Sequence, residues 1–493
     1  MGSRHGPSMR LAAKVILGIA LTLALGTGLA RWVETLAHRP SAFPGYTLVA
    51  PLLSTNTHLV DMEGRIVRTW TSEYTAGQTA YLLENGHLLR AGQVLPAERL
   101  LVGPAAGGRV QEFTWEGELV WDFKFHNAKQ VPHHDIARLP NGHVLLLVWE
   151  LKTAEETIAA GRRPEAVAGP WLADSVLEVR PTGPTTGEVV WEWHVWDHLI
   201  QDRDASRANY GEVAAHPELI DINVGESLAT EVARTTPSPD TLKTLRSIGY
   251  VGSRSQRAAP EITPDWTHIN AVAYNAELDQ IMLTVRQFHE FWIIDHSTTP
   301  AEAAGHTGGR SGKGGDLLYR WGNPQAYRAG TKADQRLFAP HDAQWIPRDR
   351  PGAGHALVFN NGLGRPGGDY SSVDELVLPV DAHGHYVREP GMSYGPNEPI
   401  WRFTAPTKTE FFAGFMSGAQ RLPNGNTLIC NGVSGTIFEV TRNKEAVWTY
   451  TYAETGKSRS SGSAPPGRNP VFRAYRYGVD YPGLAGRDLR PGG

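Results

Sequence analysis

The sequence predicts an all-β fold, a six-bladed β-propeller that carries an N-terminal signal or anchor segment and a partly helical insertion between blades three and four. Three observations lead to this prediction: Asn-Gly turns that join apolar runs, repeated units of four short strands, and a C-terminal strand without a partner near it in the chain. The 53 glycines, 34 prolines and 15 tryptophans agree with many short strands and tight turns.

Composition excludes several classes of protein before any motif is considered. Hydrophobic residues make up 41% of the 493 residues and charged residues 20%, so the chain is neither disordered nor collagen-like. A formal net charge of −4 and the absence of a long Lys/Arg run argue against a nucleic-acid partner. Cys430 is the single cysteine, which rules out an intramolecular disulfide and a thiolate pair for zinc.

Residues 1–40 have the pattern of a signal peptide or membrane anchor. Arg10 and Lys14 precede the apolar run VILGIALTLALGTGLA (15–30), as in the n-region and h-region of exported proteins. A cleaved signal and an uncleaved anchor both fit, because so short a run spans a bilayer only if Lys14 snorkels. We therefore expect an exported protein, either periplasmic or anchored in the membrane with its fold facing the periplasm or the outside.

The repeated unit begins with an Asn-Gly hairpin. The segments LENGHLL (83–89), LPNGHVLL (139–146) and LPNGNTLI (422–429) each join two apolar runs by such a turn. Each is followed by a second pair of strands that ends in Val-Trp or a close relative, within 110–123, 176–193 and 437–450. Two further units, 268–322 and 341–403, keep this order without the Asn-Gly turn.

The ends of the chain predict that the array closes into a ring. The first unit supplies only three strands, at 47–51, 57–62 and 65–70, while VFRAYRY (471–477) is a strand left without a partner. Pairing the two ends hides the edges that an open solenoid would expose, so we expect closure. The predicted propeller covers residues 41–480 and is followed by a tail, 481–493.

Two segments do not fit a blade. Residues 197–264 form a long polar insertion, in which the spacing around Pro239–Val251 predicts one or two short helices that can cap one face of the ring. The glycine-rich run 305–316 lacks the spacing of a phosphate-binding loop and predicts a flexible loop.

The candidate site lies where the innermost strands of the blades begin. Those strands line the channel of a propeller, so residues in register on them point to one axis. The alignment places three imidazoles there, and polar neighbours beside them can fix the tautomer of each ring. Arg365, in FNNGLGR, offers a fork of donors suited to a sulfate or phosphate group. The candidate catalytic residues are His134, His268, His341 and Arg365, and the candidate substrate-binding residues are Gln78, His133, Asn270, Asp342 and Ser417.

Four segments together resemble the bacterial arylsulfotransferase family, and the resemblance extends over about residues 45–480. They are DWTHINAVAYN (265–275), PHDAQW (340–345), FNNGLGR (359–365) and SGAQRLPNGNTLI (417–429). The resemblance implies an exported six-bladed propeller that moves a sulfuryl group between phenols through a channel histidine, without a nucleotide, metal or other cofactor. Its partners would be small aryl sulfates and phenols. His268, His341 and Arg365 would have the stabilising and acid/base roles.

The chain departs from the family pattern in its last blade. It has no histidine after His385, and Ser417 stands where blade six would present its channel residue. We therefore expect another imidazole, His134 or His341, to be the nucleophile. Two alternatives stay open: a metal-dependent hydrolase that uses the three channel histidines as ligands, and a propeller that binds a ligand without catalysis.

Overall fold

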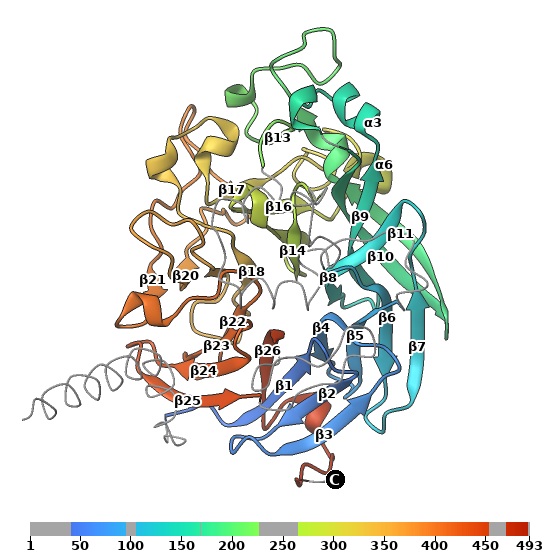
Figure 1. The fold of residues 1–493 in the computed structure, drawn as a ribbon, viewed down its shortest axis with the longest axis vertical. Coiled ribbons are helices and arrows are strands. Elements are labelled where there is room, and N and C mark those ends of the chain that lie inside the picture. Colours follow the sequence, from blue (N-terminus) through green and yellow to red (C-terminus); the bar gives the residue numbers. More distant parts are fainter. Residues whose placement is uncertain (1–40, 95–104, 168, 226–264, 453–469, 492–493) are drawn as a thin grey trace, which may run out of the picture.

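Six four-stranded antiparallel sheets surround a central axis in the computed structural model, which describes residues 41–94, 105–167, 169–225, 265–452 and 470–491 (Figure 1). The sheets confirm the predicted six-bladed propeller. Each blade is given from its innermost strand outward. Blade one is β26 (Val471–Gly478), β1 (Gly45–Pro51), β2 (Asn56–Val60) and β3 (Ile66–Thr71); blade two is β4 (Ala76–Leu82), β5 (Leu88–Gln93), β6 (Gly108–Phe113) and β7 (Leu119–Lys124); and blade three is β8 (Gln130–Arg138), β9 (Val144–Lys152), β10 (Trp171–Gly183) and β11 (Thr186–His194). Blade four is β14 (Ile269–Asn275), β15 (Gln280–Val285), β16 (Glu290–Asp295) and β17 (Tyr319–Trp321); blade five is β18 (His341–Trp345), β19 (Ala356–Asn360), β20 (Ser372–Leu376) and β21 (Trp401–Phe403); and blade six is β22 (Gly418–Arg421), β23 (Thr427–Asn431), β24 (Thr436–Val440) and β25 (Ala446–Thr451).

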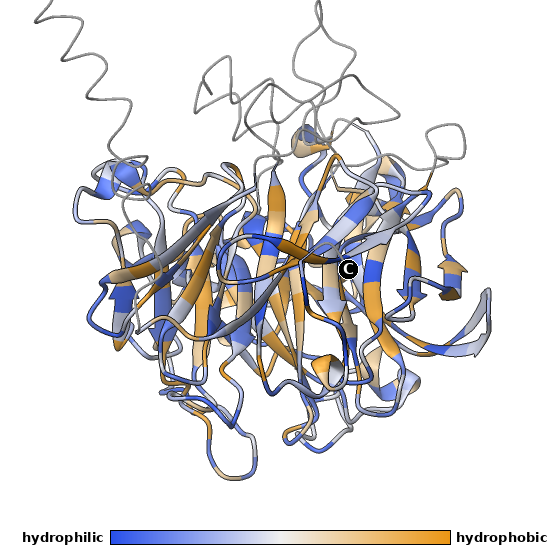
Figure 2. Cartoon of the chain, turned by 90° about the horizontal axis from the view of Figure 1, so that it is seen from below, coloured by the Kyte–Doolittle hydropathy of each residue, from blue (hydrophilic) through white to orange (hydrophobic). Residues whose placement is uncertain are grey.

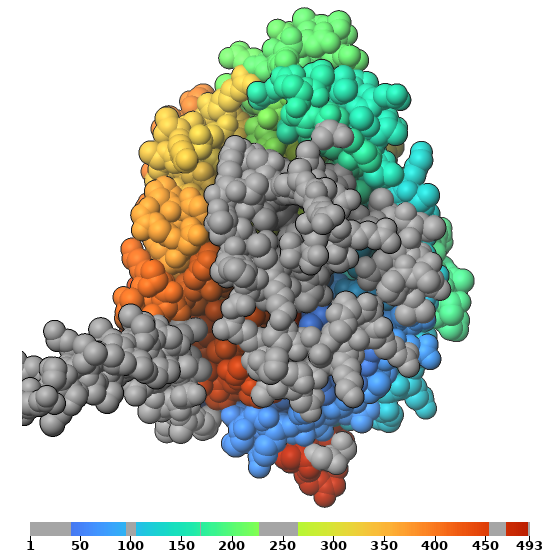
Figure 3. Space-filling view, viewed as in Figure 1, coloured from blue at the N-terminus to red at the C-terminus, as the bar shows by residue number. Residues whose placement is uncertain are grey.

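The ring closes where the two ends of the chain meet in blade one. Strand β26 pairs antiparallel with β1, with Thr47 opposite Arg476. The space-filling view shows the blue first blade beside the red end of the chain (Figure 3). The C-terminal strand thus supplies the innermost strand that the first unit lacks, as the sequence predicts, and the backbone groups of β1 gain a partner on their inner side.

Tryptophans on the outer strands link each blade to the next. The Trp448 indole nitrogen of blade six donates to the carbonyl oxygen of Met62 in blade one, at 2.7 Å. Equivalent bonds run from Trp70 to Thr114 O, Trp121 to Thr186 O, Trp191 to Thr298 Oγ1, Trp321 to Pro396 O and Trp401 to Arg442 O. The recurring Val-Trp ending is therefore explained by a ring of hydrogen bonds between neighbouring blades.

The core lies between the blades. Residues 144–149 of β9 are all fully buried, because each sheet is covered on both faces. Leu145 and Leu147 pack in the cluster shared with blade four, whereas Val144, Leu146 and Val148 pack with blade two. Figure 2 shows the same pattern, with apolar residues along the strands and polar residues at many of the turns.

The described helices are short and lie outside the blades. They are α3 (Ala154–Ala159), α6 (Pro300–Ala303) and the 3₁₀ helices Pro164–Ala166, Val195–His198, Val213–Ala215, Arg286–Phe288, Pro324–Tyr327, Lys332–Asp334, Lys408–Glu410 and Pro482–Leu484. Among the residues that can be described, none of the helices is both long and apolar enough to traverse a bilayer.

Two predicted segments lie outside the described residues. They are the signal or anchor segment, residues 1–40, and the helix expected near Pro239–Val251. The described part of the insertion holds the two-residue strands β12 (Leu199–Ile200) and β13 (Ile220–Asp221), which pair in parallel.

The residues after 480, which the sequence assigns to a tail, pack against blades one and two. Leu484 is buried in the cluster that also contains Leu82 and Leu88. The Tyr481 hydroxyl donates to the carbonyl oxygen of Leu82 at 2.8 Å. This segment therefore belongs to the packed fold at least as far as Leu484.

Candidate active site

A bulge at the start of the innermost strand recurs around the ring. In blades two to five, the strand pairing shifts register at this point. A residue other than glycine adopts a positive φ there in blades two to six, which is a strained backbone conformation that is common at functional sites. These residues are Gln78 (105°), His134 (50°), His268 (50°), Asp342 (53°) and Ser417 (84°). The sequence alignment placed His341 in this set, but the structure places Asp342 there and His341 one residue earlier.

The imidazoles of blades three, four and five meet near the axis. The ring centroids of His134 and His268 lie 4.6 Å apart, and both side chains are fully buried. Phe472 of the closing strand lies 5.9 Å from His134 and 6.2 Å from His341, measured between centroids. The predicted convergence of three histidines from separate blades is thus present, with an aromatic ring between two of them.

Two short polar contacts in series favour one tautomer of His134. Nε2 of His133 lies 2.8 Å from a carboxylate oxygen of Asp174, and Nδ1 of His133 lies 2.8 Å from Nδ1 of His134. Because a carboxylate only accepts, we assign the His133 proton to Nε2, which leaves its Nδ1 as an acceptor. His134 then carries its proton on Nδ1, and its lone pair is on Nε2.

His268 has the same tautomer for a different reason. Its Nδ1 contacts the carboxylate of Asp265, so Nδ1 carries the proton and Nε2 the lone pair. Burial raises the pKa of Asp265 to about 7, although electrostatic interactions with His133 and Arg286 oppose this rise. The Asp265–His268 pair is therefore poised to gain or lose a proton near neutral pH.

Burial also keeps two of the channel imidazoles, those of His134 and His341, uncharged. It lowers the pKa of His134 well below its ordinary value, and the neighbouring rings of His268 and His133 lower it further. The pKa of His341 falls for the same reason, with Arg286 adding to the effect of burial. A neutral imidazole has the lone pair that a nucleophile needs.

His341 uses both of its ring nitrogens within the protein. Its Nδ1 donates to Oδ1 of Asn361 at 2.7 Å, and its Nε2 accepts from the backbone nitrogen of Met416 at 3.1 Å. Asn361 in turn donates to the carbonyl oxygen of Met416 at 2.9 Å. His341 therefore connects blade five to the loop before blade six, and its lone pair is occupied.

The contacts of Arg365 lie within blade five. Its Nη2 donates to Ser372 Oγ at 3.1 Å, and its guanidinium stacks over Tyr370, 4.2 Å from the ring centroid. None of the contacts recorded for it in the described chain reaches His134, His268 or His341.

Two buried arginines that sequence reasoning missed act on the channel instead. Arg286 is 1% exposed, its backbone nitrogen donates to His268 O at 3.1 Å, and its charge lowers the pKa of His341. Arg473 is held by Asp135 at 2.7 Å and by Asp342 at 3.2 Å. In the sequence, Arg286 follows an apolar strand and Arg473 lies within the closing strand. Arginines are common at both kinds of position, so the sequence alone does not mark either one as a site residue.

The remaining candidates divide into two groups. Gln78 Oε1 and Asn270 Oδ1 are buried without a hydrogen-bond partner in the described structure, which is typical of atoms that face a ligand or water. Ser417, in contrast, accepts a hydrogen bond from the backbone nitrogen of Gly432 at 3.0 Å. Ser417 therefore has a structural contact at the position where the family pattern predicts a channel residue.

Asp342 and Arg473 line a cavity that none of the three channel histidines lines. This cavity, of about 650 Å³, is lined by the later residues of the inner strands, including Tyr81, Tyr475 and Tyr477. Burial raises the pKa of Asp342 to about 6, and the charge of Arg473 opposes this rise.

Within the described residues, the three channel histidines are not among the groups whose ligand atoms are close enough for a shared metal ion.

Comparisons with known proteins identify relatives of this chain. The family model described as Arylsulfotransferase (ASST) matches residues 53–461. An arylsulfate sulfotransferase of Escherichia coli is 24% identical over 396 residues, which cover 78% of this chain and 58% of that protein. Similar solved structures include a protein of unknown function from Bacteroides caccae (10% identity, TM-score 0.43, 88% of this chain and 98% of that one) and virginiamycin B lyase from Staphylococcus aureus (9%, 0.35, 86% and 88%).

Proposed function

The chain belongs to the arylsulfotransferase family, and we propose that it transfers a sulfuryl group from an aryl sulfate ester to a phenolic acceptor, without a nucleotide, through His134. The observation that carries this proposal is the contact between His134 and His268, each of which is held through its Nδ1 so that Nε2 is the reacting atom. One ring can attack sulfur while the other moves a proton.

The first half of the reaction cleaves the donor. The Nε2 lone pair of His134 forms a bond to sulfur as the bond from sulfur to the aryl oxygen breaks. The leaving phenolate takes a proton from His268, which begins this step protonated with Asp265 as its counter-ion. The positive charge on the sulfurylated ring is relieved through the contacts to His133 and Asp174.

The second half restores the enzyme. An acceptor phenol gives its proton to Nε2 of His268, and its oxygen forms a bond to sulfur as the bond to His134 breaks. The product ester leaves, and His268 is protonated again for the next donor. The proton balance closes over the two steps, so the cycle needs no other reactant.

Charge and hydrogen bonds at the channel support binding of the sulfuryl oxygens. Arg286 is buried and acts electrostatically on both His341 and Asp265. We assign the oxyanion to Arg286 because its charge acts on the ring of His341 and on Asp265 beside His268, whereas Arg473 pairs with Asp135 and Asp342. His341 is assigned a positioning role, because both of its nitrogens are in use.

A transfer assay tests this function. The purified protein, with 4-nitrophenyl sulfate as donor and a phenol as acceptor, should release 4-nitrophenol and form the new sulfate ester without added nucleotide. Release that depends on the acceptor supports transfer. Release that is independent of any phenol indicates hydrolysis, and no release indicates a propeller that binds without catalysis, so either result contradicts the proposal.

We also propose that the protein acts outside the cytoplasm. The support is the charged and apolar pattern of residues 1–40. Fractionation of cells into cytoplasm, periplasm and membrane tests this, and recovery in the cytoplasm alone contradicts it.

A further inference from the structure

Two histidines and an aspartate meet on the outer rim, away from the inner strands that carry the channel histidines. Nδ1 of His198 lies 2.9 Å from Oδ1 of Asp316, and Nδ1 of His306 lies 2.7 Å from the same oxygen. One ligand atom from each residue falls within 4.8 Å of the other two. His198 follows β11, the outer strand of blade three, while His306 and Asp316 belong to the loop between α6 and β17 of blade four.

The hydrogen bonds of His198 fix the direction of its lone pair. Its Nε2 lies 2.9 Å from the carbonyl oxygen of Ala303, which only accepts, so Nε2 carries the proton. In the neutral ring the lone pair is then on Nδ1 and faces the carboxylate of Asp316. A lone pair and a carboxylate repel each other unless a cation lies between them. A ring that donates one nitrogen to a backbone carbonyl and offers the other is the usual arrangement of a metal-binding histidine.

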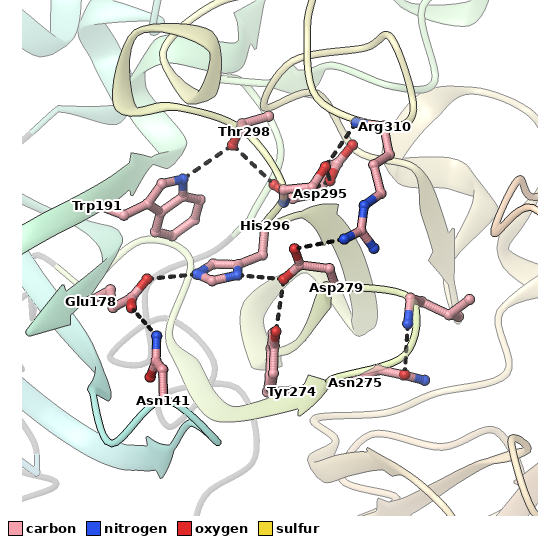
Figure 4. A network of polar contacts seen from close by, with 12 residues as sticks. Asn141, Glu178, Trp191, Tyr274, Asn275, Asp279, Asp295, His296, Thr298 and Arg310 are labelled. Carbon is pink, nitrogen blue, oxygen red and sulfur yellow. Dashed lines mark hydrogen bonds and ion pairs between the residues drawn. The ribbon is translucent and has the colours of Figure 1, made fainter.

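The loop that supplies two of these residues is held by contacts with blades three and four. Near Asp316, the indole of Trp193 donates to Gly315 O at 2.7 Å and stacks on His198. A Cβ atom on Gly315 would lie only 2.0 Å from Ala303 O, so the close approach requires glycine. In the middle of the run, the backbone nitrogen of Ser311 donates to Asp295 Oδ2 at 2.9 Å, and ahead of α6 Trp191 donates to Thr298 Oγ1 at 3.1 Å (Figure 4). The glycine-rich run 305–316 is therefore a held loop that presents His306 and Asp316 in a fixed position.

We propose that His198 Nδ1, His306 Nδ1 and Asp316 Oδ1 bind one divalent transition-metal ion of the zinc class. Two imidazoles and a carboxylate are ligands that Zn²⁺ prefers, and three protein ligands leave at least one position for water. Access is open, because the His306 side chain is 59% exposed and lines a cavity of about 440 Å³.

The ion would tie the described part of the insertion to blade four. It would join the segment after β11 to the loop before β17, where Leu317 N already donates to Glu218 O at 3.0 Å. This inference does not depend on the proposed sulfuryl transfer, and it departs from the sequence-based expectation of no metal. Its competitor is a cluster without metal, in which His198 is doubly protonated and donates to both Ala303 and Asp316.

Metal analysis of the full-length protein separates these possibilities. The protein is purified without a histidine tag, treated with a chelator, and titrated with Zn²⁺; Co²⁺ is added separately to give a visible absorption spectrum. We expect one equivalent of Zn²⁺ to bind, and Co²⁺ to give the bands of a nitrogen and oxygen site. His306→Ala and Asp316→Asn should each weaken Zn²⁺ binding at least tenfold.

Two kinds of control locate the ion. His216 is also exposed and pairs with a carboxylate, Glu218, at 2.9 Å, so His216→Ala should leave Zn²⁺ affinity unchanged. The channel variants His134→Gln and His268→Gln should also bind one equivalent. No binding by the parent protein, or binding that His306→Ala and Asp316→Asn leave intact, overturns the proposal. Loss of Zn²⁺ in the channel variants alone overturns it as well and places the metal in the channel.

Discussion

His134 and His268 lie against each other near the channel axis, with ring centroids 4.6 Å apart and planes inclined by 59°. Each ring is oriented through its Nδ1 by a separate carboxylate, Asp174 acting through His133 and Asp265 acting directly. This arrangement leaves Nε2 as the reacting atom of both rings, with the lone pair of His134 beside the transferable proton of His268. It is the basis for assigning attack on sulfur to one ring and proton transfer to the other.

Substitution of His134 should abolish transfer. We expect His134→Gln to lower kcat by at least about 10³-fold, because the sulfuryl carrier is removed. Asp174→Asn should lower kcat by roughly 10- to 100-fold with KM little changed, since it weakens the support of His134 through His133. An amide oxygen can still accept from Thr267 Oγ1 and the backbone nitrogen of Ile269, the other contacts of Asp174. Steady-state kinetics with 4-nitrophenyl sulfate provide the measurement. Equal losses in the two variants would contradict the division of roles.

The pH dependence should differ between the two halves of the reaction. With Asp265 near pKa 7, the Asp265–His268 pair holds the additional proton below about pH 7 and loses it above. Donor cleavage needs that proton, so its rate should fall as the pH rises through about 7, and more steeply for phenyl sulfate than for 4-nitrophenyl sulfate. Transfer to the acceptor needs the Asp265–His268 pair without the additional proton, so the rate of this step should increase as the pH rises through about 7. Rapid-mixing experiments on each half separately, with Asp265→Asn as the comparison, check these opposite slopes.

Substitution of Arg286 should lower the activity more than substitution of Arg365. Arg286→Gln is expected to lower kcat/KM by roughly 10²- to 10³-fold, as for the loss of one donor to a developing oxyanion. Arg365→Gln should lower it by less than tenfold, because its contacts are with Ser372 and Tyr370. Measured values of kcat/KM for the two variants test this order, and a larger loss at Arg365 would restore it as the sulfate-binding residue.

His296 should make the stability of the fold depend on pH. It lies between Asp279 and Glu178, at 2.8 and 2.9 Å, in a network that connects blades three and four (Figure 4). Burial lowers its pKa, but these two hydrogen bonds outweigh burial and raise it to about 9. The stabilisation is therefore complete below the ordinary value near 6.5 and is lost as the pH rises to about 9.

Glu178 makes the stability of the same network depend on pH in the acid range as well. Burial raises the pKa of Glu178, but hydrogen bonds from His296 and His143 lower it to about 2, so its contribution is lost as the pH falls below about 4.5. His296→Gln should cost on the order of 2 kcal/mol of unfolding free energy at pH 6 and much less at pH 9. Denaturant unfolding at both values measures this. His355→Gln, which removes a single contact to Glu375, is the control and should show a smaller dependence on pH.

Much of the fold follows from short-range patterns. The Asn-Gly turns and Val-Trp endings predict the blades, because a hairpin and an outer-strand tryptophan are local features that each repeat carries. Closure was predictable from the unpaired segment 471–477. The acceptor of each indole hydrogen bond was not predictable, because it lies in the next blade.

The candidate site was less predictable. Alignment on the turns brought His134 and His268 into register, but in blade five the positive φ falls on Asp342, one residue after His341. The sequence also could not show that Met416 and Asn361 occupy both nitrogens of His341. Arg286 was missed because a charged residue after an apolar strand usually lies in a solvated turn, whereas this one is buried.

Mass spectrometry of the protein after brief exposure to an aryl sulfate, without acceptor, tests the central claim most directly. The account predicts one sulfuryl group per chain, located on His134 and lost when a phenol is added, with no adduct in His134→Gln. An adduct on His268 or His341, or an unmodified protein that still releases phenol, would contradict it.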